Sequence, residues 1–322
     1  MKRHHKFIFV LFYIVCLFSK AQQAPQYAQF TLNHLPNNPA YGGTHLGMEI
    51  WMGKRYQWLG FDNAPEQTFA SVMYSWRRNY NYKAVHSVGG YVEQDQLGVF
   101  NFKSAHAYYA LHLKLSRKWK MGFGIFAGAR SAGISSAVLS VSDPAYNFVK
   151  PVLYMYPDFI PGWRIYSRDV FFDVSVKNLY KNKLQQGSQK LGDNSSLIPQ
   201  PIIMMGCRLH SSTNDFVFVP ALKIQGVIAK QIPLIDANFI TYIRKRLGLG
   251  ITYRVGVSAS AIVQIRIKNN MMLGFAYEYM VNRLRYYYPA TTEAIFGFSP
   301  ILGTDEERPS VNRAVMCPEF DY

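Results

Sequence analysis

The strongest constraint on this chain is an alternation of apolar and polar side chains, with a period of two, over segments of about ten residues. Between residues 104 and 115 the apolar face carries Ala105, Ala107, Tyr109, Leu111, Leu113 and Leu115, and the other face carries Ser104, His106, His112 and Lys114. The segments 170–177, 258–268 and 271–282 alternate in the same way, with Ile262 as an exception on a polar face. This is the period of a β-strand, because successive side chains point to opposite faces.

Weaker examples of the pattern recur along the chain. They lie near 46–54, 66–76, 84–93, 119–130, 200–210, 215–226, 234–243, 247–254 and 291–298, with one more weak candidate near 135–141. Bacterial single-chain membrane barrels favour even strand numbers, so we predict about fourteen strands, with twelve as the next possibility. The segments 142–165 and 181–201 are rich in polar and turn-forming residues and are predicted to be loops.

The length of these segments and the composition favour a membrane barrel. A tilted strand needs about 9–11 residues to cross a bilayer. Only 17 % of the residues are charged, 49 % are hydrophobic, and the chain has 23 Tyr and 22 Phe. The alternative is a soluble β-sandwich or a lipocalin-like barrel, since those folds also alternate. We predict an all-β fold, an antiparallel transmembrane β-barrel with its apolar face towards lipid and its polar face towards the lumen.

Residues 1–21 have the features of a secretory signal peptide. Lys2, Arg3 and Lys6 form a basic start, an apolar run from Phe7 to Phe18 follows, and Ser19-Lys20-Ala21 gives a small-x-small cleavage site. We expect residues 22–300 to form the barrel and residues 301–322 to form a periplasmic tail. The mature chain keeps two cysteines, Cys207 and Cys317, and nothing in the sequence pairs them.

No pattern in the chain predicts catalysis, a cofactor or a metal. The glycine-rich stretch Gly122–Gly128 fits no phosphate-binding motif and lies in an alternating segment, so we interpret its glycines as structural. His106 and His112 are about 20 Å apart along one strand and cannot share a metal without another element. The chain carries a net charge of +16, but its basic residues cluster at predicted strand ends, which favours lipid headgroups or an acidic partner over nucleic acid. Alternation also predicts that arginine is costly at lipid-facing Val263 and tolerated at lumen-facing Gln264.

Two compact motifs lie near the start of the mature chain. The first runs from Ala24-Pro25-Gln26-Tyr27 to Asn38-Pro39-Ala40-Tyr41-Gly42-Gly43, and the second is Arg55-Tyr56-Gln57-Trp58-Leu59-Gly60-Phe61-Asp62-Asn63-Ala64-Pro65. Together they closely resemble the PorP/SprF family of Bacteroidetes, outer-membrane proteins of the type IX secretion system. Members of that family open with a stretch like DPQFSQY…N…NPAYAG, followed by R-x-QW-x-GF-x-x-AP.

The resemblance continues to the end of the chain. It includes Val176-Lys177-Asn178-Leu179, Gly274-Phe275-Ala276-Tyr277-Glu278 and the tail Cys317-Pro318-Glu319-Phe320. Thr292 stands where the family commonly has histidine, and Asn37 stands where it commonly has leucine. The residues that the resemblance marks for partner docking or for closing the barrel are Asn38, Pro39, Ala40, Tyr41, Gly43, Gln57, Trp58, Gly60, Phe61, Pro65, Cys317, Pro318 and Phe320.

The resemblance implies a non-enzymatic outer-membrane protein that helps to secrete or retain exported adhesin-type cargo. The implied partners are outer-membrane lipid, periplasmic ring or lipoprotein subunits of the secretion system, and cargo with a C-terminal signal domain. The alternative is a porin for small solutes. A lumen filled by the segment 24–65 favours docking, whereas a wide solvated lumen favours the porin. In either case Trp58 and Phe61 beside Gly60 suit a membrane-interface loop or a plug.

Overall fold

The structure is a computed structural model of the whole chain, and its topology is that of a closed antiparallel barrel. It describes residues 26–77, 84–134, 152–180, 185–186, 189–190, 197–211, 215–226, 233–244, 246–267, 270–287 and 290–299. The predicted signal peptide, the weak strand candidate at 135–141 and the tail 301–322 lie outside these residues. Within the described residues, two short 3-10 helices, η1 (Pro39–Tyr41) and η4 (Arg283–Tyr286), accompany the strands.

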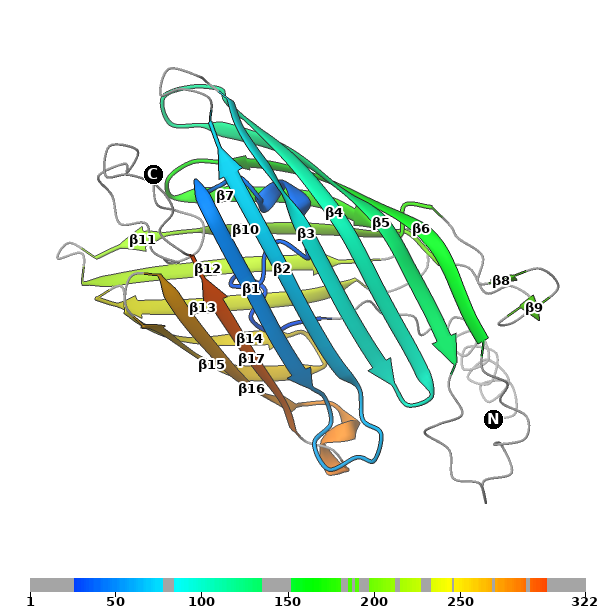
Figure 1. Cartoon of the computed structure of the whole chain (residues 1–322). Helices are drawn as coiled ribbons and strands as arrows, with labels where there is room; N and C mark the ends of the chain where they lie inside the picture. Colours follow the sequence, from blue (N-terminus) through cyan, green and yellow to red (C-terminus); the bar gives the residue numbers. More distant parts are fainter. Residues whose placement is uncertain are drawn as a thin grey trace, which may run out of the picture.

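The wall consists of fourteen strands, each paired with its neighbours in antiparallel fashion (Figure 1). They are β1 (Gly47–Tyr56), β2 (Glu66–Trp76), β3 (Ala84–Leu97), β4 (Phe100–Lys114), β5 (Lys120–Ile134), β6 (Val152–Tyr166), β7 (Val170–Lys177), β10 (Gln200–Cys207), β12 (Phe216–Gln225), β13 (Leu234–Ile243), β14 (Leu247–Arg254), β15 (Ser258–Ile267), β16 (Met271–Met280) and β17 (Ala290–Phe298). β11 (Leu209–His210) continues β10 along β12, and β8 (Gln185–Gln186) and β9 (Gln189–Lys190) form a separate small hairpin. The first and last strands close the wall, with Trp51 opposite Gly297 and Arg55 opposite Glu293.

The predicted faces of the strands are confirmed. Outward side chains such as Val263, Phe275 and Tyr277 are exposed on the outside of the wall, whereas Gln264 and Glu278 are buried inside. Ile262, the exception in its alternating segment, is also buried inside. Near the short-turn end, several outward-facing side chains are aromatic, among them Tyr74, Trp76 and Phe123. Such aromatic residues are typical of the edge of a lipid-facing band.

Both loop predictions were wrong in part. The predicted loop 181–201 contains the small hairpin of β8 and β9 and the first residues of β10. The sequence also favoured a loop over 142–165, but β6 occupies Val152–Tyr166 and pairs with β5 along its whole length. Its other neighbour, β7, pairs with it only from Gly162 to Tyr166. Pro157 and Pro161 therefore lie where the described strand has a single hydrogen-bonded neighbour, and a proline is tolerated there because no second strand needs its missing N–H.

The two ends of the barrel differ in the length of their connections. One end carries the short turns 77–83, 115–119, 167–169, 208–215, 244–246 and 268–270, and the other carries 57–65, 98–99, 135–151, 178–199, 226–233, 255–257 and 281–289. Outer-membrane barrels have short periplasmic turns and longer extracellular loops. We therefore assign the short-turn end, where β1 begins and β17 ends, to the periplasm.

Among the described residues no helix has the length and hydropathy needed to cross a membrane.

Arginine substitution at two outward positions tests the extent of the apolar band. Val263 is 39 % exposed near the middle of β15, so Val263→Arg places a charge among lipid chains and is expected to cost about 2–4 kcal/mol. Thr68→Arg is the matched control, because Thr68 is an exposed outward residue in a cross-strand row with Lys54, Gln94 and Lys103. We expect heat-modifiable gel mobility to show less folded barrel for the first variant alone, and equal losses would contradict the assigned band.

Candidate functional site: a filled lumen with two different mouths

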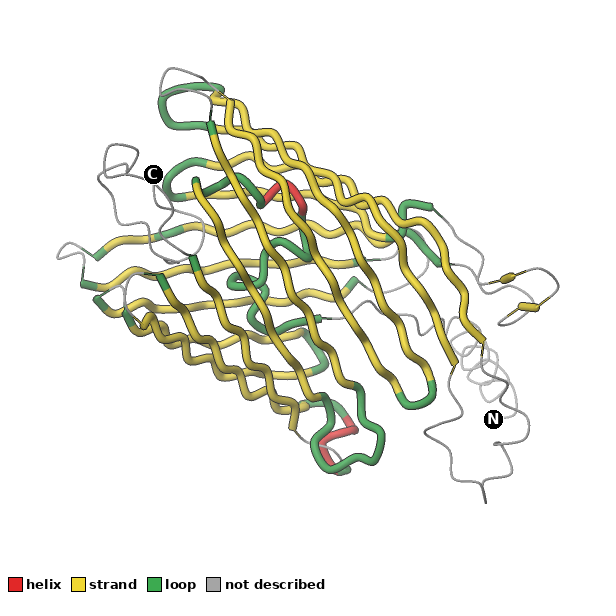
Figure 2. Tube along the Cα trace, viewed as in Figure 1, coloured by secondary structure: helices red, strands yellow, loops and turns green. Residues whose placement is uncertain are grey.

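The N-terminal segment of the described chain fills the inside of the barrel. Residues 26–44 are all buried, and we call this segment the plug. Figure 2 shows it as a loop with one helical turn, η1, running behind the front strands. It starts near the long-loop end, where Thr252 bonds the carbonyl of Ala28, and reaches the short-turn end at Gly42, whose carbonyl bonds His112. The barrel wall and the plug therefore form one packed body.

The first family-like motif builds the central turn of the plug. The Asn38 side chain accepts a hydrogen bond from the Ala40 amide and caps η1, while its amide group donates to the carbonyl of Trp163 in β6. Pro39 occupies the first helical position, which suits its fixed φ and its missing N–H. Tyr41 stacks on His34 with ring centroids 5.0 Å apart. These contacts fix Asn38, Pro39, Ala40 and Tyr41 against the wall rather than at a surface.

Glycines in the wall make room for this turn. A Cβ on Gly124 of β5 would clash with backbone atoms of Pro39 and Ala40, and one on Gly162 of β6 would clash with Asn38. Gly43 of the motif has φ +102° and faces His112, so it needs both a left-handed backbone and the absence of a side chain. The glycine-rich stretch of β5 is thus structural, as predicted, and its specific role is close approach of the plug.

A chain of alternating charges holds the beginning of the plug. Lys223, Asp236, Arg254, Glu278, Arg55 and Glu293 follow one another across the lumen, with N···O distances of 2.8, 2.8, 3.2, 3.0 and 3.4 Å between successive partners. The Glu293 carboxylate ends the chain by accepting hydrogen bonds from the amides of Ala28 and Gln29, at 2.5 and 3.2 Å. The Lys223 ammonium also lies 5.0 Å from the centroid of the Phe30 ring. Every buried charge here has a partner of opposite sign.

Two smaller charge clusters lie on the other side of the lumen. Asp173 of β7 pairs with Arg164 of β6 at 2.7 Å and with His34 of the plug at 3.1 Å. Asp158 of β6 pairs with His106 of β4 at 3.2 Å. His34 and His106 are therefore partners of separate lumen carboxylates. No group of three or more potential metal ligands occurs among the described residues.

The buried lumen corrects one expectation. Arginine at Gln264 was expected to cost little, but Gln264 is 0 % exposed and accepts a hydrogen bond from the Tyr242 hydroxyl at 2.6 Å. Its side chain also donates to Gln29 of the plug at 3.4 Å. The expectation assumed a solvated lumen, and the plug removes that solvent.

The second family-like motif forms a surface loop at the long-loop mouth. The loop 57–65 is fixed by three residues with positive φ, Trp58 (55°), Gly60 (91°) and Asn63 (58°), and by a hydrogen bond from the Leu59 amide to the Ala290 carbonyl. The Gln57 side-chain oxygen accepts a hydrogen bond from Arg55, and the Gln57 backbone N–H donates to the Pro65 carbonyl. Together with Tyr56, Glu66 and Gln96, the loop encloses a hollow of about 290 Å³.

This loop presents apolar side chains to the outside. Leu59 is 42 % and Phe61 43 % exposed, and Trp58 packs against Phe61 edge-to-face at 6.4 Å. Beside it in the connection 281–289, Tyr286 and Tyr287 are 72 % and 75 % exposed. Trp58 and Phe61 therefore lie in a surface loop and not in the plug. The plug is formed by the first motif.

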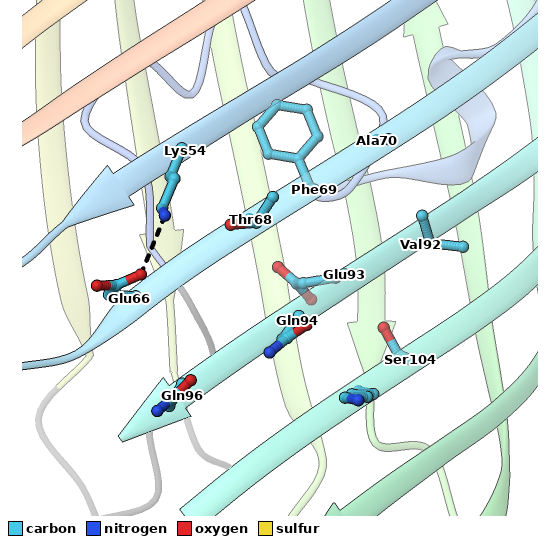
Figure 3. A pocket seen from close by; sticks show the side chains of 11 residues that line it. Lys54, Glu66, Thr68, Phe69, Ala70, Val92, Glu93, Gln94, Gln96 and Ser104 are labelled. Carbon is cyan, nitrogen blue, oxygen red and sulfur yellow. Dashed lines mark ion pairs between the residues drawn. The ribbon is translucent and has the colours of Figure 1, made fainter. Parts of the chain in front are cut away.

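A depression on the wall next to this loop marks where the apolar band ends. It has a volume of about 500 Å³ and crosses β1–β4 (Figure 3). Lys54 pairs there with Glu66 at 3.0 Å, and both side chains are exposed. Outward Thr68, Gln94 and Gln96 continue the polar surface towards Lys103. Charges in this position face the headgroup region rather than lipid chains.

The comparison with family models matches residues 19–298 to the description "Type IX secretion system membrane protein PorP/SprF". The chain belongs to the PorP/SprF family. The resemblance is thereby confirmed for the motifs within residues 19–298, and so is the outer-membrane barrel that it implied, whereas the tail motif Cys317-Pro318-Glu319-Phe320 lies beyond the match.

Solved structures similar to this PorP/SprF protein are barrels as well. The Ralstonia pickettii toluene transporter TbuX is 9 % identical over 84 % of this chain and 93 % of its own, with a TM-score of 0.50. The deltaS2S3 mutant of the monoaromatic hydrocarbon channel TodX is 9 % identical over 83 % and 94 %, also with a TM-score of 0.50. Identities this low show the fold alone. No curated protein matches the chain.

Within this PorP/SprF barrel the marked residues divide into three places. Asn38, Pro39, Ala40, Tyr41 and Gly43 are in the plug, and Gln57, Trp58, Gly60, Phe61 and Pro65 are in the long-loop mouth. Cys317, Pro318 and Phe320 lie outside the described residues. The alternation over 170–177 and 271–282 predicts that Asp173 and Glu278 face the lumen, which the structure confirms. Sequence reasoning missed five further lumen charges: Arg55, Lys223, Asp236, Arg254 and Glu293. The sequence signal that could have identified them is a charged residue at an inward position of an otherwise apolar strand.

A Cβ on Gly124 tests whether the plug closes the barrel. Gly124→Ala forces a methyl group into backbone atoms of Pro39 and Ala40, so we expect the plug to shift and ion conductance across planar bilayers to rise. Gly90→Ala is the control, because its Cβ would meet only the His106 carbonyl at an ordinary 3.7 Å. Equal conductance in the two variants would show that the plug does not limit permeation.

Neutralising Glu293 tests the charge chain. Glu293→Gln removes one of the two carboxylate partners of Arg55 and weakens the acceptor of two plug amides. Breaking a buried ion pair costs about 3–5 kcal/mol. Glu66→Gln breaks only the exposed pair with Lys54 and should cost about 0–1 kcal/mol. Unfolding of the purified barrel in urea measures both. A similar midpoint for the two variants would mean that the lumen is solvated.

Proposed function

We propose that this barrel is a non-enzymatic docking or anchoring subunit of the type IX secretion system for exported adhesin-type cargo. The observation that carries the proposal is the plug, whose residues 26–44 are buried along the lumen. A barrel of about fourteen strands is too narrow for a folded adhesin even when empty. A filled barrel of this size suits a fixed membrane platform better than a conduit.

The anchoring surface that we infer is the long-loop mouth, which the connection lengths assign to the cell exterior. Its Leu59 and Phe61 are exposed by about two fifths of their surface, and a loop of fixed backbone holds them in place. Exposed apolar side chains on a rigid support are typical anchors of protein interfaces, because little conformational entropy is lost when they bind. The C-terminal signal domain of exported cargo is the partner we propose for this surface.

The alternative function is a channel for small solutes. TbuX and TodX are described as a toluene transporter and a monoaromatic hydrocarbon channel. Transferring that function here would require a route past the plug, whose turn lies directly on wall glycines and which is surrounded by paired charges of the wall. The packing of the plug therefore supports docking over conduction.

Charge on the exposed loop tests the proposal. Leu59→Asp combined with Phe61→Asp removes two apolar anchors, each worth about 2 kcal/mol in a buried contact, so surface display of cargo should fall more than about tenfold. Cargo at the cell surface is measured by antibody labelling of intact cells, and heat-modifiable mobility checks that the barrel is folded. The control is Val255→Asp, at an exposed apolar residue in another turn of the same end. Unchanged display in the double variant, or equal loss in the control, would contradict the loop's role.

A further inference from the structure

The short-turn end of the barrel carries a dense collection of basic side chains. The described basic residues of this end are Arg77, Lys114, Arg117, Lys118, Lys120, Arg168, Arg208, Arg244, Arg246 and Arg266, and we call them the basic rim. The described acidic residues there are Glu49, Asp169 and Asp215. Glu49 pairs with His45 at 3.0 Å, and Asp169 lies 3.7 Å from Arg208. The rim therefore has a large excess of positive charge.

Part of the rim faces the mouth of the lumen rather than the lipid. Lys120 lies over the ring of buried Tyr166, 5.9 Å from its centroid, and the charges of Arg77 and Lys114 act on it. Arg266 has the same inward parity as buried Gln264, and its amide bonds the Arg246 carbonyl across the β14–β15 pair. Lipid headgroups reach outward side chains, and the outward positions next to the rim are aromatic, such as Trp76 and Phe123. The rim is thus placed for an anionic group that approaches along the barrel axis.

The chain itself contains an acidic segment that starts at this end. Residues 301–322 have five acidic residues against two arginines, and Asp305, Glu306 and Glu307 are consecutive. β17 ends at the short-turn end, where Ser299 bonds Asn270 and Met48.

The length of chain after Ser299 is sufficient for contact with the rim. Six residues lead to Asp305 and span up to about 20 Å. β15 and β2 each lie two strands from β17, about 10 Å away at the usual strand spacing. Arg266 on one side and Arg77 on the other are therefore within reach of the acidic segment.

We propose that the acidic segment Asp305–Glu307 docks on the basic rim at the short-turn end of the barrel. Covalent attachment gives the segment a high effective concentration at the rim, so several exposed ion pairs suffice for a contact that free peptide would form only weakly. The proposal is independent of cargo binding at the opposite mouth. Its consequence is that the last residues of the tail, including Phe320, leave the barrel from a defined place.

A nitroxide label in the tail measures this contact in the full mature protein. In a Cys207→Ser, Cys317→Ser background, a label on Thr304→Cys reports the immobilised fraction by electron paramagnetic resonance in outer-membrane vesicles. We expect an immobilised population that falls about tenfold with Asp305→Lys, Glu306→Lys and Glu307→Lys together, the factor expected for the loss of three exposed ion pairs. Sodium chloride at 1 M should have the same effect, because it shortens the screening length to about 3 Å.

Charge exchange separates this contact from other occupants of the rim. Arg77→Glu, Arg246→Glu and Arg266→Glu should also release the label, and combining them with the three lysine substitutions should restore immobilisation. Reversal of Arg283 and Arg285, exposed basic residues at the opposite end, is the control and should change nothing. Heat-modifiable mobility checks that each barrel is folded. A label that is mobile in the parent protein, or immobile in every variant, overturns the proposal. So does release without rescue, because a separate acidic protein or lipid would then be the occupant.

Discussion

A closed barrel in a membrane must satisfy every polar group inside it without help from lipid, and in this protein the Glu293 carboxylate shows how that is done. It faces the lumen from β17, pairs with Arg55 of the adjoining β1, and accepts the amides of Ala28 and Gln29. A buried carboxylate with one partner removed is strongly destabilising, whereas a fully hydrogen-bonded one is tolerated. The plug is therefore part of the folded barrel, because wall charges and plug backbone satisfy one another.

The alternation of side chains predicted most of the fold, for a physical reason. Lipid and lumen differ in polarity, so a wall strand such as β15 or β16 has one apolar and one polar face. The alternation in the sequence shows both faces. The same reasoning fails for β6, because Pro157 and Pro161 resemble loop residues unless it is known that the strand lacks a second neighbour over that stretch. Pairing is a property of the assembled sheet, and no local pattern reports it.

The filled lumen was only partly predictable. The plug has no period, since residues 26–44 contact several strands through turns rather than through one face. The inward-facing glycines Gly124 and Gly162 nevertheless indicate its position, because they leave space where the plug approaches the wall backbone. Inward charges such as Asp173 are a second indication, because a charge inside the barrel requires either water or a partner of opposite sign. Only the structure distinguishes these two, and here His34 and Arg164 provide the partners.

The distribution of charge and apolar surface gives the barrel a direction. The long-loop mouth exposes apolar side chains around Phe61, and the short-turn mouth concentrates basic residues around Lys120. Between them, the plug crosses the lumen with its contacts to Glu293 at one end and to His112 at the other. A plug bound at both ends and in the middle moves only if several buried hydrogen bonds and the contact between His34 and Asp173 break together. The energy of such a movement is large compared with one surface contact, so a partner at either mouth meets a rigid platform, and the two mouths can act independently of each other.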